Sequence, residues 1–292
     1  MNQPVRSVTL FSICFLFSLS VLPSYSQDVE INTMLMQTTF RIRGEGSGGT
    51  CFILIKVQPS PALVFVTAAH ILENIQGQTA VITFRRQVNN TLWVPLDITA
   101  QIRRGDTPLW VQHPSADVAV AYLSLPPRTR LHFDGLSTRF LASDKTLLDL
   151  KIHPGDTLFT LGFPVGYSYG QGIFPILRSG TIATYPLLPT SETKTFLFDF
   201  EVFPGNSGGP VYGVFRGFRS ASEVRVGGNQ YILGLVSRQV GYYKNTIDAE
   251  PKRLSLAEVV HGSLIKETID LLPPPGTSEA QAATIKGVSI AR

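Results

Sequence analysis

The chain has 292 residues, of which 43% are hydrophobic and 16% are charged, and its formal net charge is +4. This composition fits a globular protein of one large domain or two small ones. Neighbouring basic residues form short pairs, Arg85-Arg86 and Arg103-Arg104, which usually lie on solvated hairpin faces, and this pattern excludes a nucleic-acid-binding module. The many Gly, Pro and Phe residues favour short strands joined by turns.

Residues 1–26 have the parts of a secretory signal peptide. Arg6 supplies the positive start, residues 8–22 are mostly apolar, and small residues at 24 and 26 mark a cleavage position. The apolar run is short for a membrane span and is interrupted by serines, so we expect cleavage after residue 26 rather than an uncleaved anchor. The sequence therefore predicts an exported protein, periplasmic or secreted, without a stable membrane anchor.

Six strand-like segments follow in the first half of the chain. Residues 44–49 form a glycine-rich turn between the first two segments, His70 follows the third, and Asp117 directly precedes the sixth. Residues 124–150 predict a connection to a second unit. The six segments are residues 38–43, 50–57, 63–67, 79–84, 93–98 and 118–123.

The second half of the chain contains five strand-like segments, which are followed by a segment with the apolar spacing of a helix. Residues 254–272 place apolar side chains at helical spacing; a capping box at Ser255 and Glu258 or a later start near Gly262 would both fit. The remaining residues are weakly patterned, so 273–292 is expected to be a flexible tail. The five strand-like segments are residues 156–161, 176–184, 195–200, 211–215 and 232–236.

The segment from Gly205 to Pro210, Gly-Asn-Ser-Gly-Gly-Pro, surrounds the candidate nucleophile Ser207. A serine hydroxyl needs a base to take its proton, a carboxylate to orient that base, and amide N–H groups for the developing oxyanion. The glycines suit such a loop because they allow unusual backbone angles and a close approach of substrate.

His70 is the candidate base and Asp117 the candidate orienting acid. His70 follows two small alanines at a strand end, and Asp117 opens an apolar strand, unlike its competitors Asp106 and Asp134. The remaining histidines show no metal-ligand spacing, and we expect neither a metal nor an organic cofactor. Cys51 is expected to be a buried small hydrophobe rather than a competing nucleophile.

The order His, Asp, Ser and the three motifs around them resemble the trypsin-like peptidases of the chymotrypsin fold, especially the bacterial branch related to HtrA/Deg proteases. The resemblance implies an all-β fold of two six-stranded antiparallel barrels with a C-terminal helix. It places the first barrel in residues 27–140 and the second barrel with the helix in 141–272. The residues after 272 are too few for the PDZ domain of HtrA proteases. Only one cysteine follows the signal peptide, so a disulfide-free bacterial enzyme is expected.

The same resemblance implies an oxyanion hole formed by the backbone N–H groups of Gly205 and Ser207. Asn206 stands where trypsin has the aspartate that pairs with a new N-terminus. Activation by internal zymogen cleavage is therefore not expected.

Specificity is predicted from two further segments. Ser237, Arg238 and Gln239 resemble the strand that pairs with substrate backbone. Glu201, six residues before Ser207, lies where the family places the base of its primary pocket, so it would select Lys or Arg. Alternatively Glu201 turns to solvent, and an apolar pocket is shaped by Val202 and Phe203.

The sequence thus predicts an exported serine endopeptidase that acts on proteins or peptides through an acyl-enzyme on Ser207. The alternative is a secreted binding protein that keeps the protease fold without catalysis. An esterase of the α/β-hydrolase type is disfavoured because that fold places the serine first in the chain.

Overall fold

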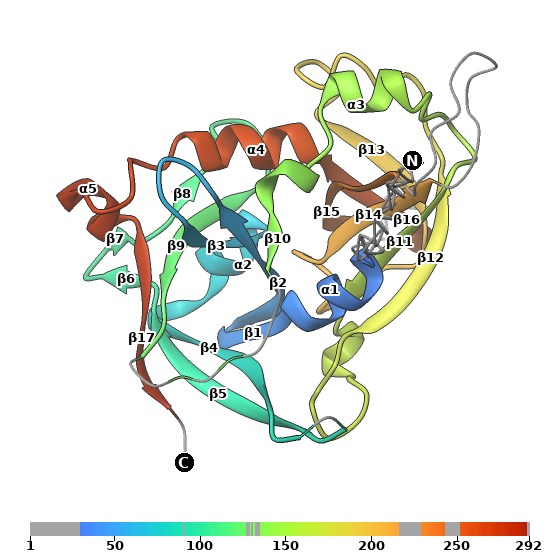
Figure 1. The fold of residues 1–292 in the computed structure, drawn as a ribbon. Helices are drawn as coiled ribbons and strands as arrows, with labels where there is room; N and C mark the ends of the chain where they lie inside the picture. Colours follow the sequence, from blue (N-terminus) through green and yellow to red (C-terminus); the bar gives the residue numbers. More distant parts are fainter. Residues whose placement is uncertain are drawn as a thin grey trace, which may run out of the picture.

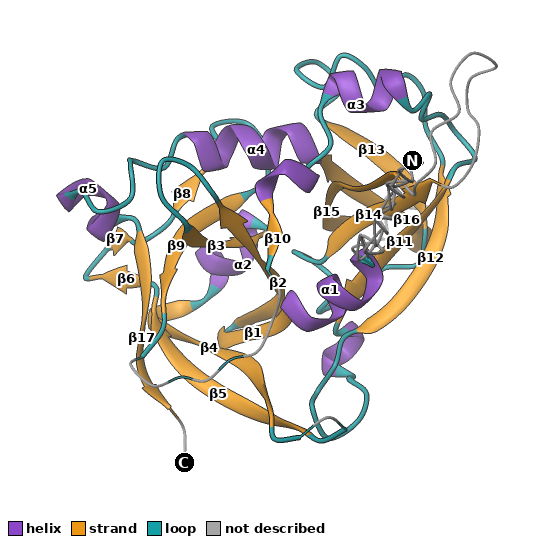
Figure 2. Ribbon diagram, in the orientation of Figure 1, coloured by secondary structure: helices purple, strands orange, loops and turns teal. Residues whose placement is uncertain are grey.

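Two closed β-barrels lie side by side in the computed structural model of the protein (Figures 1 and 2). This is the two-barrel, chymotrypsin-like architecture that the sequence predicts. The predicted signal peptide lies outside the described residues. So do His132, one of the remaining histidines, and Asp134, a competitor of Asp117. The structure describes residues 30–89, 91–126, 129, 131, 135–215, 229–242 and 252–290.

Seven strands form the first barrel, in the order β1-β4-β5-β17-β9-β3-β2, and pairing of β1 with β2 closes the ring. A short β8 (Val111–Gln112) pairs with β9, β10 (Leu136–Ser137) pairs with β2, and β6 (Arg103–Arg104) and β7 (Thr107–Pro108) form a separate hairpin. The seven ring strands are β1 (Thr39–Glu45), β2 (Ser47–Lys56), β3 (Ala62–Thr67), β4 (Gln76–Gln87), β5 (Trp93–Gln101), β9 (Ala119–Ser124) and β17 (Thr284–Ile290).

The predicted flexible tail is wrong for the part of it that the structure describes. After a short helix, α5 (Ser278–Ala282), the strand β17 fills the gap between β5 and β9, antiparallel to the first and parallel to the second. Ile285 is fully buried there. Backbone hydrogen bonds to two neighbouring strands order a segment with few apolar side chains, so composition alone did not reveal it. The first barrel consequently has seven strands rather than six, one pair is parallel, and the range 27–140 does not contain it all.

Six antiparallel strands close the second barrel in the order β11-β12-β13-β16-β15-β14. The predicted helix over 254–272 is half wrong, because its first part is β16, paired with β13 on one side and β15 on the other. The later start is correct: α4 covers Gly262–Asp270. The six strands are β11 (Thr157–Gly162), β12 (Ile176–Ile182), β13 (Thr195–Asp199), β14 (Pro210–Phe215), β15 (Asn229–Tyr242) and β16 (Lys252–His261).

The larger of two hydrophobic clusters fills the first barrel and extends to residues of the second such as Tyr212 and Leu235, the smaller lies in the second barrel, and α4 joins the two halves of the molecule. Leu264, Ile265 and Ile269 of α4 belong to the larger cluster, although the helix follows the last strand of the second barrel. Figure 1 shows α4 lying across both barrels at one edge of the molecule. The other helices are α1 (Ile31–Thr38), α2 (Ala69–Asn74), α3 (Asp144–Asp149) and the short 3₁₀ turns η1 (Thr138–Phe140) and η2 (Pro164–Gly166).

Arg85, expected on a solvated hairpin face, is buried with 2% of its surface exposed. Its guanidinium lies over the rings of Phe40 and Phe174, at 4.7 and 4.6 Å. Burial lowers the pKa of Arg85 to about 9. Hydrogen bonds connect it to the end of α1 and to the loop before β12, so one side chain joins the two barrels. The acceptors are the carbonyl oxygens of Met36, Gln37, Thr39, Gly172 and Ile173.

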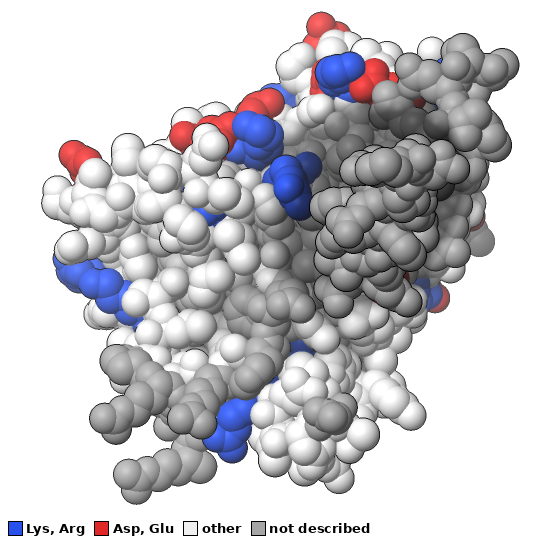
Figure 3. Space-filling view, in the orientation of Figure 1, with Lys and Arg blue, Asp and Glu red and all other residues white. Residues whose placement is uncertain are grey.

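Charged side chains are sparse on the face drawn in Figure 3, where most described residues are neither acidic nor basic. Asp and Glu lie mainly along one edge, over α3, α4 and α5 (Figures 1 and 3). Among the described helices, none is long and apolar enough to cross a membrane.

Candidate active site

His70 lies in the first turn of α2, directly after the buried strand β3. The strand is a short run of apolar and β-branched residues, as expected for a strand buried on both faces. The extended Ala68 ends it, and both Ala68 and Ala69 are buried, so the backbone before His70 can pack closely against other segments. The imidazole remains partly exposed, with about a third of the side-chain surface accessible (34%).

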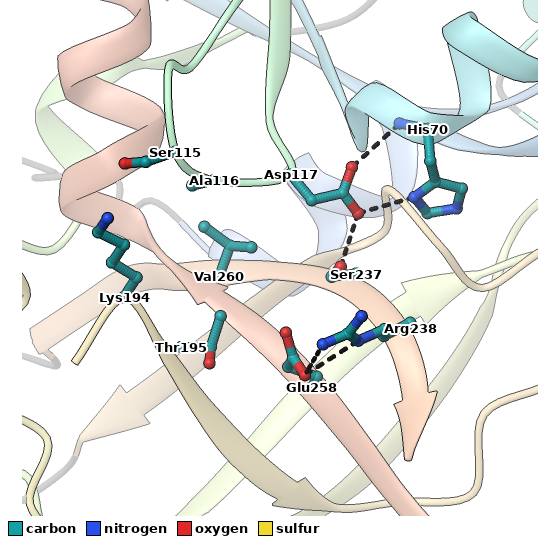
Figure 4. A pocket seen from close by; sticks show the side chains of 10 residues that line it. All are labelled: His70, Ser115, Ala116, Asp117, Lys194, Thr195, Ser237, Arg238, Glu258 and Val260. Carbon is teal, nitrogen blue, oxygen red and sulfur yellow. Dashed lines mark hydrogen bonds and ion pairs between the residues drawn. The ribbon is translucent and has the colours of Figure 1, made fainter. Parts of the chain in front are cut away.

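Asp117, in the turn between β8 and β9, accepts three hydrogen bonds (Figure 4). The His70 backbone N–H is 3.0 Å from Oδ1, and Nδ1 of His70 is 2.7 Å from Oδ2. The third comes from the Ser237 hydroxyl, 2.6 Å from Oδ2. Sequence reasoning expected Ser237 only as a backbone partner of substrate and missed this side-chain role, because only the barrel pairing brings β15 to Asp117.

These hydrogen bonds determine the protonation of the pair. Burial alone would raise the pKa of Asp117, but the hydrogen bonds from His70 and Ser237 outweigh it and lower the pKa to about 2. The carboxylate is therefore ionised at neutral pH and can only accept hydrogen bonds. Nδ1 of His70 must then carry a proton, and in this tautomer of the neutral imidazole Nε2 is the acceptor.

The turn that carries Ser207 is held by its own backbone and by both barrels. Inside the turn, the buried Asn206 accepts a hydrogen bond from the Phe203 N–H (2.9 Å) through Oδ1. Outside it, the Ser207 carbonyl accepts from the Thr50 N–H of the first barrel (2.8 Å), and the Gly208 N–H donates to the Val236 carbonyl of the second (2.7 Å). Asn206 therefore stabilises the turn by a hydrogen bond inside it. This role does not require pairing with a newly formed N-terminus.

The Ser207 turn packs against the residues that precede His70. A Cβ at Gly208 would lie 2.4 Å from Oγ1 of Thr67 and 3.1 Å from the backbone nitrogen of Ala68. Only glycine allows this approach, and Gly208 has a φ of +82°. Among the described residues, however, the Ser207 hydroxyl makes no hydrogen bond to His70. The structure brings His70, Asp117 and Ser237 together by side-chain bonds and places Ser207 beside them through backbone packing.

Gly205 and Ser207 have backbone N–H groups that donate to no other described residue. The carbonyl of Gly205 is occupied: Oγ1 of Thr50 donates to it at 2.6 Å. With a φ of +99°, Gly205 also lies so close to Phe163 that a Cβ would be 2.1 Å from the Phe163 carbonyl oxygen. Two neighbouring free donors in a glycine turn are the arrangement that an oxyanion requires.

The predicted substrate strand has one open edge beside His70. Strand β15 pairs with β14 only over 229–235, while its other side continues to pair with β16. Residues 237–239 therefore have an edge that β14 does not cover. The Arg238 guanidinium lies against Glu258 (3.0 Å), and Nε2 of Gln239 is buried without a hydrogen-bond partner in the described part of the chain. A cavity of about 430 Å³ lies here, lined in part by His70, Asp117, Ser237, Arg238 and Glu258 (Figure 4).

The residues predicted for the primary pocket do not line that cavity. Glu201 is half-buried, and its carboxylate makes no hydrogen bond or ion pair with the described residues; its carbonyl accepts from Arg178 (2.8 Å). Val202 is buried in the cluster of the second barrel, so it does not shape an open pocket. Arg178 also lies 5.6 Å from the ring centroid of Phe203. Sequence reasoning missed Arg178, which the pairing of β12 with β13 brings next to this segment.

The described residues contain no cluster of three or more His, Cys, Asp or Glu side chains that could hold a metal ion. Cys51 is free and fully buried, and burial raises the pKa of its thiol. The prediction that Cys51 behaves as a buried small hydrophobe is confirmed, because a buried neutral thiol cannot reach substrate.

Neither protein-family models nor curated proteins match the chain. Solved structures do overlap with it. The inactive form of the Rv3671c protease matches with a TM-score of 0.43 and 16% identity over 85% of this chain and 94% of that one. A serine-to-alanine mutant of Rv3671c from M. tuberculosis H37Rv gives the same score and identity. The protease Anisep from Arthrobacter nicotinovorans matches with 0.44 and 15% over 80% and 93%.

Proposed function

We propose that this protein is an exported serine endopeptidase with Ser207 as nucleophile, His70 as general base and Asp117 as the orienting carboxylate. The observation that carries the proposal is the Asp117–His70 pair, which leaves Nε2 free to accept a proton at the point where the Ser207 turn packs. Its motifs suggest the bacterial branch related to HtrA/Deg proteases.

The chemistry follows from these groups. The Ser207 oxygen attacks the carbonyl carbon of the scissile bond while Nε2 of His70 takes the hydroxyl proton. The resulting oxyanion accepts hydrogen bonds from the N–H groups of Gly205 and Ser207. The carbon–nitrogen bond then breaks, and His70 returns the proton to the leaving amine. Water, activated by the same imidazole, hydrolyses the acyl-enzyme and restores Ser207.

Asp117 and Ser237 act by orienting their neighbours. Asp117 holds the imidazole in one tautomer and stabilises the imidazolium that forms during attack. Ser237 is a positioning residue, because its hydroxyl fixes Oδ2 of Asp117. The Ser207–His70 hydrogen bond would form when substrate binds, since catalytic hydrogen bonds are often long in the free enzyme and tighten in the complex.

The substrates would be proteins or peptides that add a strand to the open edge of residues 237–239. Backbone pairing at this edge would hold the acyl half of the substrate in line with Ser207. The Lys or Arg preference from Glu201 remains part of this proposal: its carboxylate has no partner among the described residues and is therefore available.

The second candidate function is a secreted binding protein with the same fold. The missing Ser207–His70 hydrogen bond favours it, because a hydroxyl that is never activated would give binding at the open edge without cleavage. This candidate and the peptidase differ in whether Ser207 is nucleophilic.

A fluorophosphonate probe separates the two candidates. We expect the parent to gain the probe mass on Ser207, Ser207→Ala to gain none, and Ser124→Ala, an exposed serine on β9, to label like the parent. Intact mass spectrometry with peptide mapping gives the readout. Failure of the folded parent to label, or equal labelling of Ser207→Ala, would overturn the catalytic proposal.

A further inference from the structure

A second cavity, about 300 Å³ in volume, adjoins Gly205. It shares no lining residue with the cavity beside His70: its walls come from β1, the start of β2, the η2 loop and the turn at Pro204 and Gly205. The η2 loop is attached to the oxyanion turn: the Val165 N–H donates to the Pro204 carbonyl at 2.6 Å. The two cavities are therefore separate, and of the two only the second is lined by Gly205, one of the candidate oxyanion donors.

The position of the second cavity defines which half of a substrate reaches it. The open edge at residues 237–239 belongs to the first cavity and would hold the acyl half of the substrate. A chain held there crosses the oxyanion hole at its scissile carbonyl. The residues after the scissile bond must continue past Gly205, and the cavity there is the second one.

Two arginines bring positive charge to this cavity, but only one of them is neutralised. Arg43 donates to Oδ2 of Asp97 at 2.5 Å and to Oγ1 of Thr83 at 2.6 Å. The guanidinium of Arg41 forms no ion pair with the described residues; its only hydrogen bond to them joins Nη1 to the Gly166 carbonyl at 3.5 Å. No Asp or Glu is among the lining residues.

The surroundings of Arg41 leave its charge incompletely satisfied. Its Nε is buried and has no hydrogen-bond partner among the described residues. Partial burial lowers the pKa of Arg41, and the charge of Arg43 lowers it further, against a smaller opposing effect of Asp97. Because Asp97 already accepts from Arg43 and Thr83, it does not offset a second cation fully. A carboxylate entering the cavity would supply the opposite charge and acceptors for the exposed terminal nitrogens of Arg41.

We propose that this cavity binds an acidic side chain of the substrate, Asp or Glu in the first two residues after the scissile bond, and that Arg41 selects it. The inference rests on the proposed peptidase function and deepens it by naming a substrate class. The guanidinium of Arg41 would donate to the substrate carboxylate through its terminal nitrogens, of which Nη1 lies at the exposed end, while Arg43 stays with Asp97.

The test uses the full-length protein and peptides amidated at the C-terminus, so that no chain-terminal carboxylate competes. A peptide that the enzyme cuts is first found by library digestion, and Glu, Gln or Lys is then placed at each of the two positions after the cut. The expected kcat/KM ratio of Glu over Gln is about tenfold, the size of one charge-assisted hydrogen bond. We expect Arg41→Gln to bring the Glu over Gln ratio close to one, and Arg41→Glu to cut the peptides with Lys at these positions faster than those with Glu.

Arg104→Gln is the matched control, an exposed arginine of β6 that touches neither cavity, and it should keep the parent ratio. A Glu over Gln ratio near one in the parent, or a ratio unchanged in Arg41→Gln, would overturn the inference. Fluorophosphonate labelling of Ser207, run on the same samples, is independent of leaving-group residues. Labelling with no acidic preference refutes the Arg41 inference alone, whereas absence of labelling refutes the peptidase function.

Discussion

The two halves of the candidate site are built in different ways. In the first barrel, His70 and Asp117 are positioned by hydrogen bonds to side chains, and Ser237 reaches across from the second barrel to join them. In the second barrel, the Ser207 turn is positioned by main-chain hydrogen bonds and by glycines that admit neighbouring backbone. The first half should therefore be sensitive to changes of side-chain chemistry, and the second half to the addition of a single carbon atom.

Asp117→Asn should have the largest effect. An amide at this position can donate to Nδ1 and so favours the wrong tautomer of His70, and the expected fall in kcat is on the order of 10⁴-fold. Peptide hydrolysis under saturating substrate measures it. Asp106→Asn changes an exposed carboxylate outside both cavities and should leave kcat at the parent value; a similar loss in both variants would contradict the assignment of Asp117.

Gly205→Ala tests the backbone half of the site. The new Cβ would meet the Phe163 carbonyl oxygen at 2.1 Å, so the turn must shift and the Gly205 N–H must leave its position. The expected loss is about 10²- to 10³-fold in kcat, the range for one oxyanion donor.

Gly155→Ala is the matched control for Gly205→Ala. Gly155 has a similar φ of +90°, but a Cβ there meets nothing within 4 Å. It should lower stability slightly through backbone strain and leave kcat unchanged. Equal losses of kcat in the two glycine variants would show that strain, and not the oxyanion donor, is responsible.

Arg85→Met tests the connection between the two barrels. It removes a buried guanidinium and leaves carbonyls of the α1 end and the 172–173 loop without their donor, so we expect a loss of about 3 kcal/mol in the free energy of unfolding. Urea unfolding measures it. Arg86→Met, on the exposed neighbour, should change the free energy by less than about 0.5 kcal/mol.

Ser237→Ala should have the smallest effect, and it is best seen in the pH dependence of stability. With the pKa of Asp117 held at about 2, below the ordinary 3.8, its ionised form stabilises the fold above pH 3.8, and this contribution is lost as the pH falls towards 2. Removing one hydrogen bond raises that pKa, so the variant should be less stable by about 1 kcal/mol at neutral pH.

The pH range gives the check on Ser237→Ala. The difference between parent and variant should shrink as the pH falls from 4 to 2, because the protonated Asp117 no longer gains from the hydroxyl. Urea unfolding at several pH values, with Ser124→Ala as control, measures it. A difference that stays constant with pH would mean that Ser237 acts through packing.

The sequence by itself was sufficient for the features that depend on local chemistry. The motifs around His70, Asp117 and Ser207 and the alternation of short apolar segments predicted a two-barrel fold, and that fold is confirmed. Burial of Cys51 also followed from its apolar neighbours. Such features can be read from neighbouring residues because they need few distant partners.

Tertiary structure alone decided the features that depend on distant backbone partners. Thr284–Ile290 became a barrel strand, and Lys252–His261 a strand instead of a helix, because each pairs on both sides with strands far away in the chain. Arg85 was buried for the same reason, since its carbonyl acceptors come from two separate segments. Hydrogen bonds between distant segments leave no periodic trace in the residues that form them, and so they appear only when the barrels close.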